Sequence, residues 1–92
     1  MPSQSKIRTI SVDDEAPARA RIRQLLRNEP DFELIAECAN GRQAVETVLA
    51  EKPDLVFLDV QMPRLTGFDV CEAIGAEHLP QVVFVTASPA RF

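Results

Sequence analysis

Short runs of apolar residues alternate along this chain with longer segments in which apolar residues recur every three or four positions. The short runs predict β-strands over 6–12, 32–38, 55–58 and 81–85. The longer segments lie between these strands and predict amphipathic helices. The resulting order, βαβαβαβ, predicts an α/β fold with a parallel sheet, right-handed crossovers and helices on both faces.

The first helix is expected to begin directly after the acidic pair Asp13-Asp14. Asp14 is a plausible N-cap, and Pro17 lies in the first turn, where a missing N–H is harmless. The core-facing side is predicted by four apolar residues at helical spacing, Ala18, Ile22, Leu25 and Leu26. The arginines of this segment lie mostly on the other faces, which we expect to be solvated.

The remaining boundaries follow from glycine and proline. A second helix is expected between the Asn40-Gly41 turn and Lys52-Pro53, and a third from Gly67 to about Ala76. Acidic residues alternate with apolar ones over 32–38, which suits a strand at the sheet edge. The run at 55–58 is apolar throughout, which is typical of a central parallel strand.

Length and composition predict one soluble domain over 1–92, with a disordered start at 1–5 and a tail at 88–92. The chain has 92 residues, of which 46% are hydrophobic and 26% charged, and its net charge is −4. No basic stripe is present, so we expect no direct binding of nucleic acid. The apolar runs are too short to cross a bilayer, which favours a cytoplasmic protein. Cys38 and Cys71 are interpreted as small core residues rather than a disulfide or metal ligands.

Polar side chains follow three of the predicted strands. The first strand ends in Asp13-Asp14, the third in Asp59 and the fourth in Thr86. Ligands of doubly wound sheets bind beyond the carboxyl ends of the strands, so these side chains are expected to meet there. Three converging carboxylates repel one another unless a cation neutralises them. All of these ligands are hard oxygens, which favours Mg²⁺ over zinc.

A carboxylate beside such an ion can attack phosphorus and form an aspartyl phosphate. Asp59 has the nucleophile's position, and the hydroxyl of Thr86 could balance charge on the phosphoryl oxygens. Either acidic site alone could serve as a helix cap or a turn. The combination of the two with a strand-end threonine indicates function.

Three stretches resemble the receiver domain of bacterial response regulators. They are ISVDDE at 10–15, DLVFLDVQMPRLTGFDV at 54–70 and VVFVTA at 82–87. The resemblance implies a flavodoxin-like, doubly wound sheet of strand order 2-1-3-4, dependence on Mg²⁺ and phosphotransfer from a histidine kinase. DDEAPARARIRQLL and FELIAECANGRQAVE are also similar to regulators whose output is a LytTR-type DNA-binding domain.

The resemblance also implies a role for each motif residue. Asp59 matches the phosphoacceptor, and Asp14 matches the direct Mg²⁺ ligand. Asp13 matches the acid that is linked to the metal through water. The backbone carbonyl of Gln61 would also bind the metal, and Thr86 would move toward the phosphoryl group and signal its presence.

The chain departs from the family pattern after its fourth strand. Receivers continue through a helix, a fifth strand that ends in a phosphate-contacting lysine, and a final helix. We therefore expect an incomplete fold that lacks the last strand and the last two helices. Lys6 and Lys52 do not occupy the position of that lysine. The fourth strand would then be a bare apolar edge, which predicts self-association.

Two alternatives to a phosphoaccepting signalling domain stay open. A Mg²⁺-dependent phosphohydrolase of the haloacid dehalogenase type also has an aspartate after a hydrophobic strand, but it needs a second acid where Gln61 stands. A receiver-like interaction module without phosphotransfer would need no lysine. We expect a signalling domain rather than an enzyme.

Overall fold

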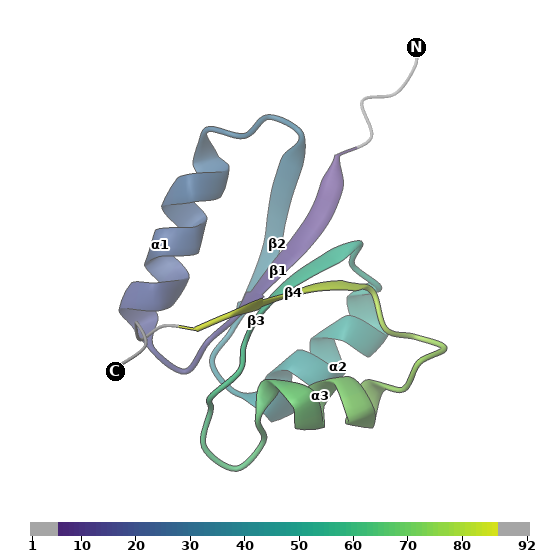
Figure 1. Cartoon of the computed structure of the whole chain (residues 1–92). Coiled ribbons are helices and arrows are strands. Elements are labelled where there is room, and N and C mark those ends of the chain that lie inside the picture. Colours follow the sequence, from purple (N-terminus) through teal and green to yellow (C-terminus); the bar gives the residue numbers. More distant parts are fainter. Residues whose placement is uncertain (1–5, 87–92) are drawn as a thin grey trace.

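Four parallel strands form one sheet in the computed structural model of the chain, which describes residues 6–86. The strands are β1 (Ile7–Val12), β2 (Phe32–Cys38), β3 (Leu55–Asp59) and β4 (Gln81–Val85), and they lie side by side in the order β2-β1-β3-β4 (Figure 1). The predicted βαβαβαβ order and strand order are thereby confirmed. The start expected at 1–5 and the tail expected at 88–92 lie outside the described residues.

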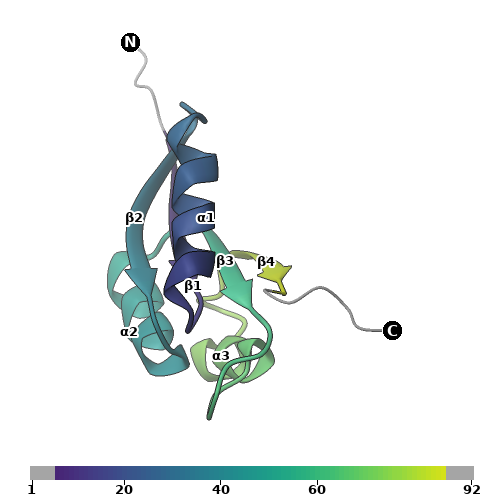
Figure 2. The same cartoon turned by 90° about the vertical axis from the view of Figure 1, so that its left-hand side faces the viewer.

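Helices cover both faces of the sheet. Helix α1 (Ala16–Arg27) lies on one face, and α2 (Gly41–Glu51) and α3 (Gly67–Ile74) lie together on the other (Figures 1 and 2). None of these helices in the described part of the chain is long and apolar enough to cross a membrane.

The buried core lies on the α2 and α3 side of the sheet. The strands and helices contribute to it Ile10, Val12, Cys38, Ala44, Val48, Val56, Leu58, Val70 and Ile74. Helix α1 has no buried residue, and Leu25 is 61% exposed. The prediction that Leu25 faces the core is therefore wrong, because helical spacing alone does not show how deeply a helix packs. Cys38 is buried and Cys71 partly so, and both are free thiols.

Two helix boundaries differ from the sequence prediction. Glu15, and not Asp14, is the N-cap residue of α1, and it makes no side-chain cap. The backbone N–H of Glu15 instead donates to Asp13 Oδ1 at 2.9 Å, a local turn that replaces a cap. Helix α3 ends at Ile74 rather than near Ala76, because Gly75 adopts a φ of 88° and leaves the helical conformation.

The edge strand β2 contains an irregularity. Thr9 pairs with Leu34 and Ile10 with Ala36, so β2 has one residue more than β1 at this point. Such a bulge twists a strand and weakens its ability to pair further. The predicted edge position of β2 is confirmed.

Candidate functional site

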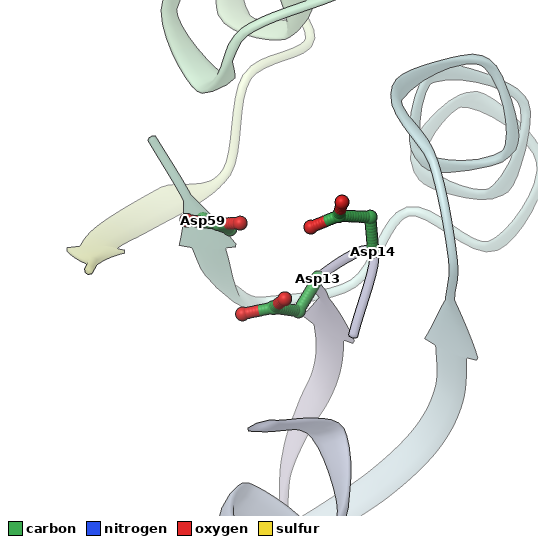
Figure 3. Close-up of side chains that lie close together, drawn as sticks. All are labelled: Asp13, Asp14 and Asp59. Carbon is green, nitrogen blue, oxygen red and sulfur yellow. The ribbon is translucent and has the colours of Figure 1, made fainter. Parts of the chain in front are cut away.

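The carboxylates of Asp13, Asp14 and Asp59 meet at the carboxyl ends of β1 and β3. Val12 pairs with Leu58, so the residues that follow them, Asp13 and Asp59, lie at the same end of the sheet. One carboxylate oxygen from each of the three acids lies within 4.8 Å of the others. Figure 3 shows the three side chains turned toward a common space. The expected convergence of these acids is therefore present.

Two of the three acids are buried and are oriented by the backbone. Asp13 is 5% exposed and Asp59 is 3% exposed, whereas Asp14 faces solvent. Asp59 Oδ1 accepts a hydrogen bond of 3.1 Å from the backbone N–H of Gln61, just as Asp13 Oδ1 accepts one from Glu15. These short-range bonds fix the carboxylates with main-chain donors, which cannot rotate away as side chains can.

The environment of Asp59 opposes its ionisation. Burial is the largest cause that raises the pKa of this carboxyl above its ordinary value of 3.8. The hydrogen bond from the Gln61 N–H acts in the opposite direction, and the nearby charges of Asp13 and Asp14 raise the pKa further. The surroundings of Asp59 thus disfavour its negative charge, and a cation bound beside it would favour that charge.

Gly67 allows α3 to begin directly against the end of β3. A Cβ atom at this position would lie 2.6 Å from the backbone oxygen of Asp59, and the Gly67 N–H donates to the Val60 carbonyl at 2.9 Å. The first turn is closed by a capping box in which Thr66 and Asp69 bond to each other's backbone N–H. Only glycine fits this close approach, which gives a physical reason for its place in the motif.

The loop between β3 and α3 contains a tight turn that the sequence did not predict. The Leu65 N–H donates to the Pro63 carbonyl at 2.8 Å, and Arg64 between them has a φ of 74°. This is a γ-turn of the rare positive-φ kind, which is strained for a residue with a side chain. Beside it lies a cleft of about 630 Å³ whose lining includes Asp14, Arg42 and Arg64. The solvent-facing acid therefore borders a cleft with two arginines.

Thr86 lies at the carboxyl end of β4, the same end of the sheet as the acids. Val85 pairs with Asp59, so Thr86 is one residue beyond that pair. Thr86 and Asp13 also line one small cavity of about 40 Å³. The three strand ends predicted to meet are thus together, and Gln61 contributes a backbone N–H whose role sequence reasoning missed.

An arginine near the acids was also missed. Arg19 Nη1 donates to the backbone carbonyl of Asp13 at 2.8 Å, and its Nε lies 3.8 Å from Glu37 Oε1. The available signal was its place in the second turn of the helix that follows the acidic pair. Lys6 precedes β1 and Lys52 precedes β3, so both lie at the amino ends of these strands, opposite the acids. His78 is exposed in the loop before β4.

Comparison with known proteins agrees with this arrangement. The sequence profile of the response regulator receiver domain matches residues 9–91, which is most of the chain. The chain belongs to the response regulator receiver domain family. The response regulator domain of Thermotoga maritima CheB has the same fold, with a TM-score of 0.81 and 30% identity over 89% of this chain and 61% of that one. A chain in the structure of the P1 domain of CheA3 in complex with CheY6 from R. sphaeroides is similar with a TM-score of 0.78 and 27% identity, over 91% of this receiver and 66% of that chain.

Curated relatives of this receiver are much longer. An uncharacterised response regulatory protein of Yersinia pestis is 44% identical over 81 residues, and the transcriptional regulatory protein BtsR of Salmonella typhi is 43% identical over 81 residues. In both cases the match covers 88% of this chain and 34% of the relative. The chain thus spans about a third of the length of these relatives.

Proposed function

We propose that this receiver domain accepts a phosphoryl group on Asp59 from a histidine kinase, with Mg²⁺ held by the acidic cluster. The observation that carries the proposal is the convergence of three carboxylates within 4.8 Å at the ends of two adjacent strands. Uncompensated buried carboxylates are costly in a structural role alone. Binding of a cation and a phosphoryl group would explain why these carboxylates lie together despite that cost.

The donor set fits Mg²⁺. Asp13, Asp14 and Asp59 offer carboxylate oxygens, and the Gln61 backbone carbonyl is the fourth proposed ligand. A cation of this kind prefers oxygen ligands and usually keeps several waters, which the solvent-facing position of Asp14 allows. When bound, Mg²⁺ would neutralise charge on the phosphoryl oxygens during transfer.

The chemistry at Asp59 is a displacement at phosphorus. A carboxylate oxygen of Asp59 attacks the phosphorus of a phosphohistidine, so that a P–O bond forms and the P–N bond breaks. The electron pair of the broken bond stays on the imidazole nitrogen, and the product is an aspartyl phosphate. The Gln61 N–H holds Asp59 in a fixed orientation through Oδ1, which reduces the motion that must be frozen before attack.

Thr86 is proposed to sense the modified state. Its position one residue beyond the Val85–Asp59 pair brings its hydroxyl to the edge of the sheet where the phosphoryl group would be added. A hydroxyl can donate a hydrogen bond to a phosphoryl oxygen. Movement of Thr86 toward the new group would alter the end of β4 and transmit the signal.

The similarity to a solved complex supports a kinase as phosphodonor. That structure contains the P1 domain of CheA3 bound to CheY6. The rival function, a phosphohydrolase of the haloacid dehalogenase type, finds no support at Gln61, which stands where its second acid is needed. We therefore propose a phospho-signalling role rather than an enzyme that turns over an external phosphate ester.

The direct test is phosphoryl labelling. The chain is incubated with Mg²⁺ and acetyl phosphate, and intact mass is measured before and after treatment with base. We expect a base-labile gain of one phosphoryl group that is lost in Asp59→Asn and retained in Asp54→Asn. Asp54 is a suitable control because it is exposed and lies before β3, where its side chain accepts the Arg8 N–H. Absence of labelling would contradict the proposal, and continuous release of phosphate would favour the hydrolase.

A further inference from the structure

The peptide group between Asp13 and Asp14 links two of the three acids of the cluster. Its C=O belongs to Asp13 and its N–H to Asp14, and the whole group is planar. Rotation of this plane changes ψ of Asp13 and φ of Asp14, and so redirects both side chains at once. Figure 3 shows the two carboxylates turned toward the same space as Asp59. A group that holds this peptide plane therefore determines the direction of two carboxylates.

Arg19 holds that peptide group. Its Nη1 donates to the Asp13 carbonyl oxygen at 2.8 Å. Two bonds with the main chain hold Asp13 as well, because its N–H donates to the Cys38 carbonyl at 3.1 Å and its Oδ1 accepts the N–H of Glu15. Of these three bonds, the one from Arg19 acts on the carbonyl that lies between the two acids.

The place of Arg19 on α1 explains how it reaches the end of β1. Its N–H donates to the carbonyl of the N-cap residue Glu15, so Arg19 lies one turn after the helix begins. Helical side chains lean toward the N-terminus of their helix, which here directs the guanidinium back to Asp13. A cation near this end of a helix is opposed by the helix dipole. The contact with Asp13, and not the dipole, therefore favours an arginine at this position.

Glu37 on β2 holds Arg19 from the other side. Arg19 Nε lies 3.8 Å from Glu37 Oε1, and Arg23 donates to both oxygens of the same carboxylate at 2.6 and 2.8 Å. The Arg19 side chain is only 20% exposed, so water screens these contacts weakly. A planar guanidinium presents donors in several fixed directions, which lets Arg19 contact the carbonyl and the carboxylate at the same time.

We propose that Arg19 is a positioning residue of the acidic cluster, which sets the direction of the Asp13 and Asp14 carboxylates through their shared peptide group and thereby raises the affinity for Mg²⁺. This role needs no contact between Arg19 and the ion. The inference rests on the proposed function, since it concerns the same metal. Loss of a group that orients metal ligands without touching the metal typically lowers affinity about 10- to 100-fold.

The sign of the effect separates positioning from charge. Arg19 is a cation near the cluster, so its charge alone repels Mg²⁺, and loss of that charge would tighten binding. Loss of the positioning contact would weaken binding instead. A purely structural role would lower stability and leave the affinity of the folded protein unchanged. Arg19→Gln removes both the charge and the reach of the side chain, so the three roles predict three different results.

The test measures the Mg²⁺ affinity of the full chain by isothermal titration calorimetry. We expect Arg19→Gln to weaken binding about tenfold or more. The matched control is Arg23→Gln, which removes an arginine from the same helix and from the same carboxylate of Glu37. The hydrogen bonds of Arg23 go to Glu37 and not to Asp13, so this variant should lose stability and keep the Mg²⁺ affinity of the wild type.

A second measurement needs no metal. The Asp14 N–H belongs to the peptide group that Arg19 holds, so its amide NMR signal in the metal-free chain should shift in Arg19→Gln and stay in place in Arg23→Gln. Arg23 still joins α1 to Glu37 in Arg19→Gln, so we expect this variant to fold, which far-UV circular dichroism checks.

Unchanged or tighter Mg²⁺ binding by Arg19→Gln, or an Asp14 signal that does not move, would overturn the positioning role. Binding of Mg²⁺ by the wild type together with an unaffected Arg19→Gln would overturn this inference alone. No binding by the wild type would overturn the proposed metal site itself, and the positioning role with it.

Discussion

Gly67 connects the packing of α3 with the position of Asp59, the proposed phosphoacceptor. A Cβ atom at Gly67 would lie 2.6 Å from the Asp59 backbone oxygen, so the lack of a side chain lets the helix begin against the end of β3. Backbone displacement here would move the carboxylate that the Gln61 N–H orients. Residues that do not bind a metal themselves can determine the orientation of those that do, and Gly67 would have this part at the proposed Mg²⁺ site.

The first prediction concerns Gly67→Ala. We expect Mg²⁺ affinity, measured by isothermal titration calorimetry, to fall roughly tenfold or more, because the added methyl group must displace the Asp59 backbone. Gly75→Ala is the control. Gly75 has a φ of 88°, and a methyl group added there would meet none of the described residues within 4 Å, so this change should lower stability while leaving Mg²⁺ affinity unchanged. Equal affinity in wild type and Gly67→Ala would count against the packing argument.

The second prediction concerns the charge on Asp59. A folded-state pKa that is raised above 3.8 means that ionisation of Asp59 destabilises the metal-free fold above that pKa. Asp59→Asn should therefore raise the melting temperature at neutral pH without Mg²⁺. The gain should shrink as pH falls through the folded pKa and should be gone below 3.8, where Asp59 is protonated in both states. Exposed Asp31→Asn should show no such gain, and a lower melting temperature for Asp59→Asn at neutral pH would contradict the argument.

Ion pairs join helix α1 to β2, and no side chain of α1 is fully buried. Arg23 Nε and Nη2 contact the two carboxylate oxygens of Glu37 at 2.6 and 2.8 Å, and Arg19 lies on the same carboxylate. The hydrogen bond from Arg23 is the largest cause that lowers the pKa of Glu37. Planar guanidinium and carboxylate groups in this two-point contact fix the orientation of the helix.

The third prediction follows from that lowered pKa. Glu37 contributes stability that is present above its ordinary pKa of 4.5 and is lost as pH falls through the lower, folded value. Glu37→Gln should reduce the melting temperature at neutral pH, and the difference from wild type should shrink below pH 4.5. Glu46→Gln removes the exposed pair with Arg42 and should have little effect at any pH. Identical pH profiles for Glu37→Gln and wild type would exclude the proposed role of the pair.

At the level of elements, the sequence predicted most of the fold for reasons that can be named. The apolar run that ends at Asp59 identified the central strand, because parallel strands are buried on both faces. The end of α3 and the γ-turn at Arg64 could not be predicted, since each depends on a positive φ that the residue types alone do not specify. The site acids were predictable because they follow strands directly, whereas the roles of the Gln61 N–H and of Arg19 depend on backbone direction and helix packing.

The molecule as a whole is asymmetric across its sheet. The buried core lies between the sheet and the pair α2 and α3, while the face under α1 is only partly covered. Helical periodicity predicts an apolar face for a helix on either face of the sheet, but it does not show how deeply that helix packs. The exposure of Leu25 could therefore not be predicted from spacing. The LytTR-type subfamily stays a prediction, because the matched region is the receiver alone.

The fourth prediction tests where the core lies. Ile10→Val should lower the free energy of unfolding by about 1 kcal/mol, because Ile10 is fully buried on the α2 and α3 face. Leu25→Ala should change it by less than about 0.5 kcal/mol, although it removes more atoms. Urea denaturation followed by circular dichroism measures both. A larger loss for Leu25→Ala would mean that α1 shields more of the core than its exposure indicates.

Binding of Mg²⁺ by the acidic cluster is central to the proposed function, and a titration followed by backbone amide NMR tests it directly. Addition of Mg²⁺ to the metal-free chain should shift the amide signals of Asp13, Asp14, Asp59 and Gln61 together, along one saturating curve. Signals at the opposite edge of the sheet, such as those of Lys6 and Asp54, should stay in place. No shift at the acids, or equal shifts at the carboxyl and amino ends of the strands, would contradict the assignment of this cluster as the metal-dependent phosphoacceptor site.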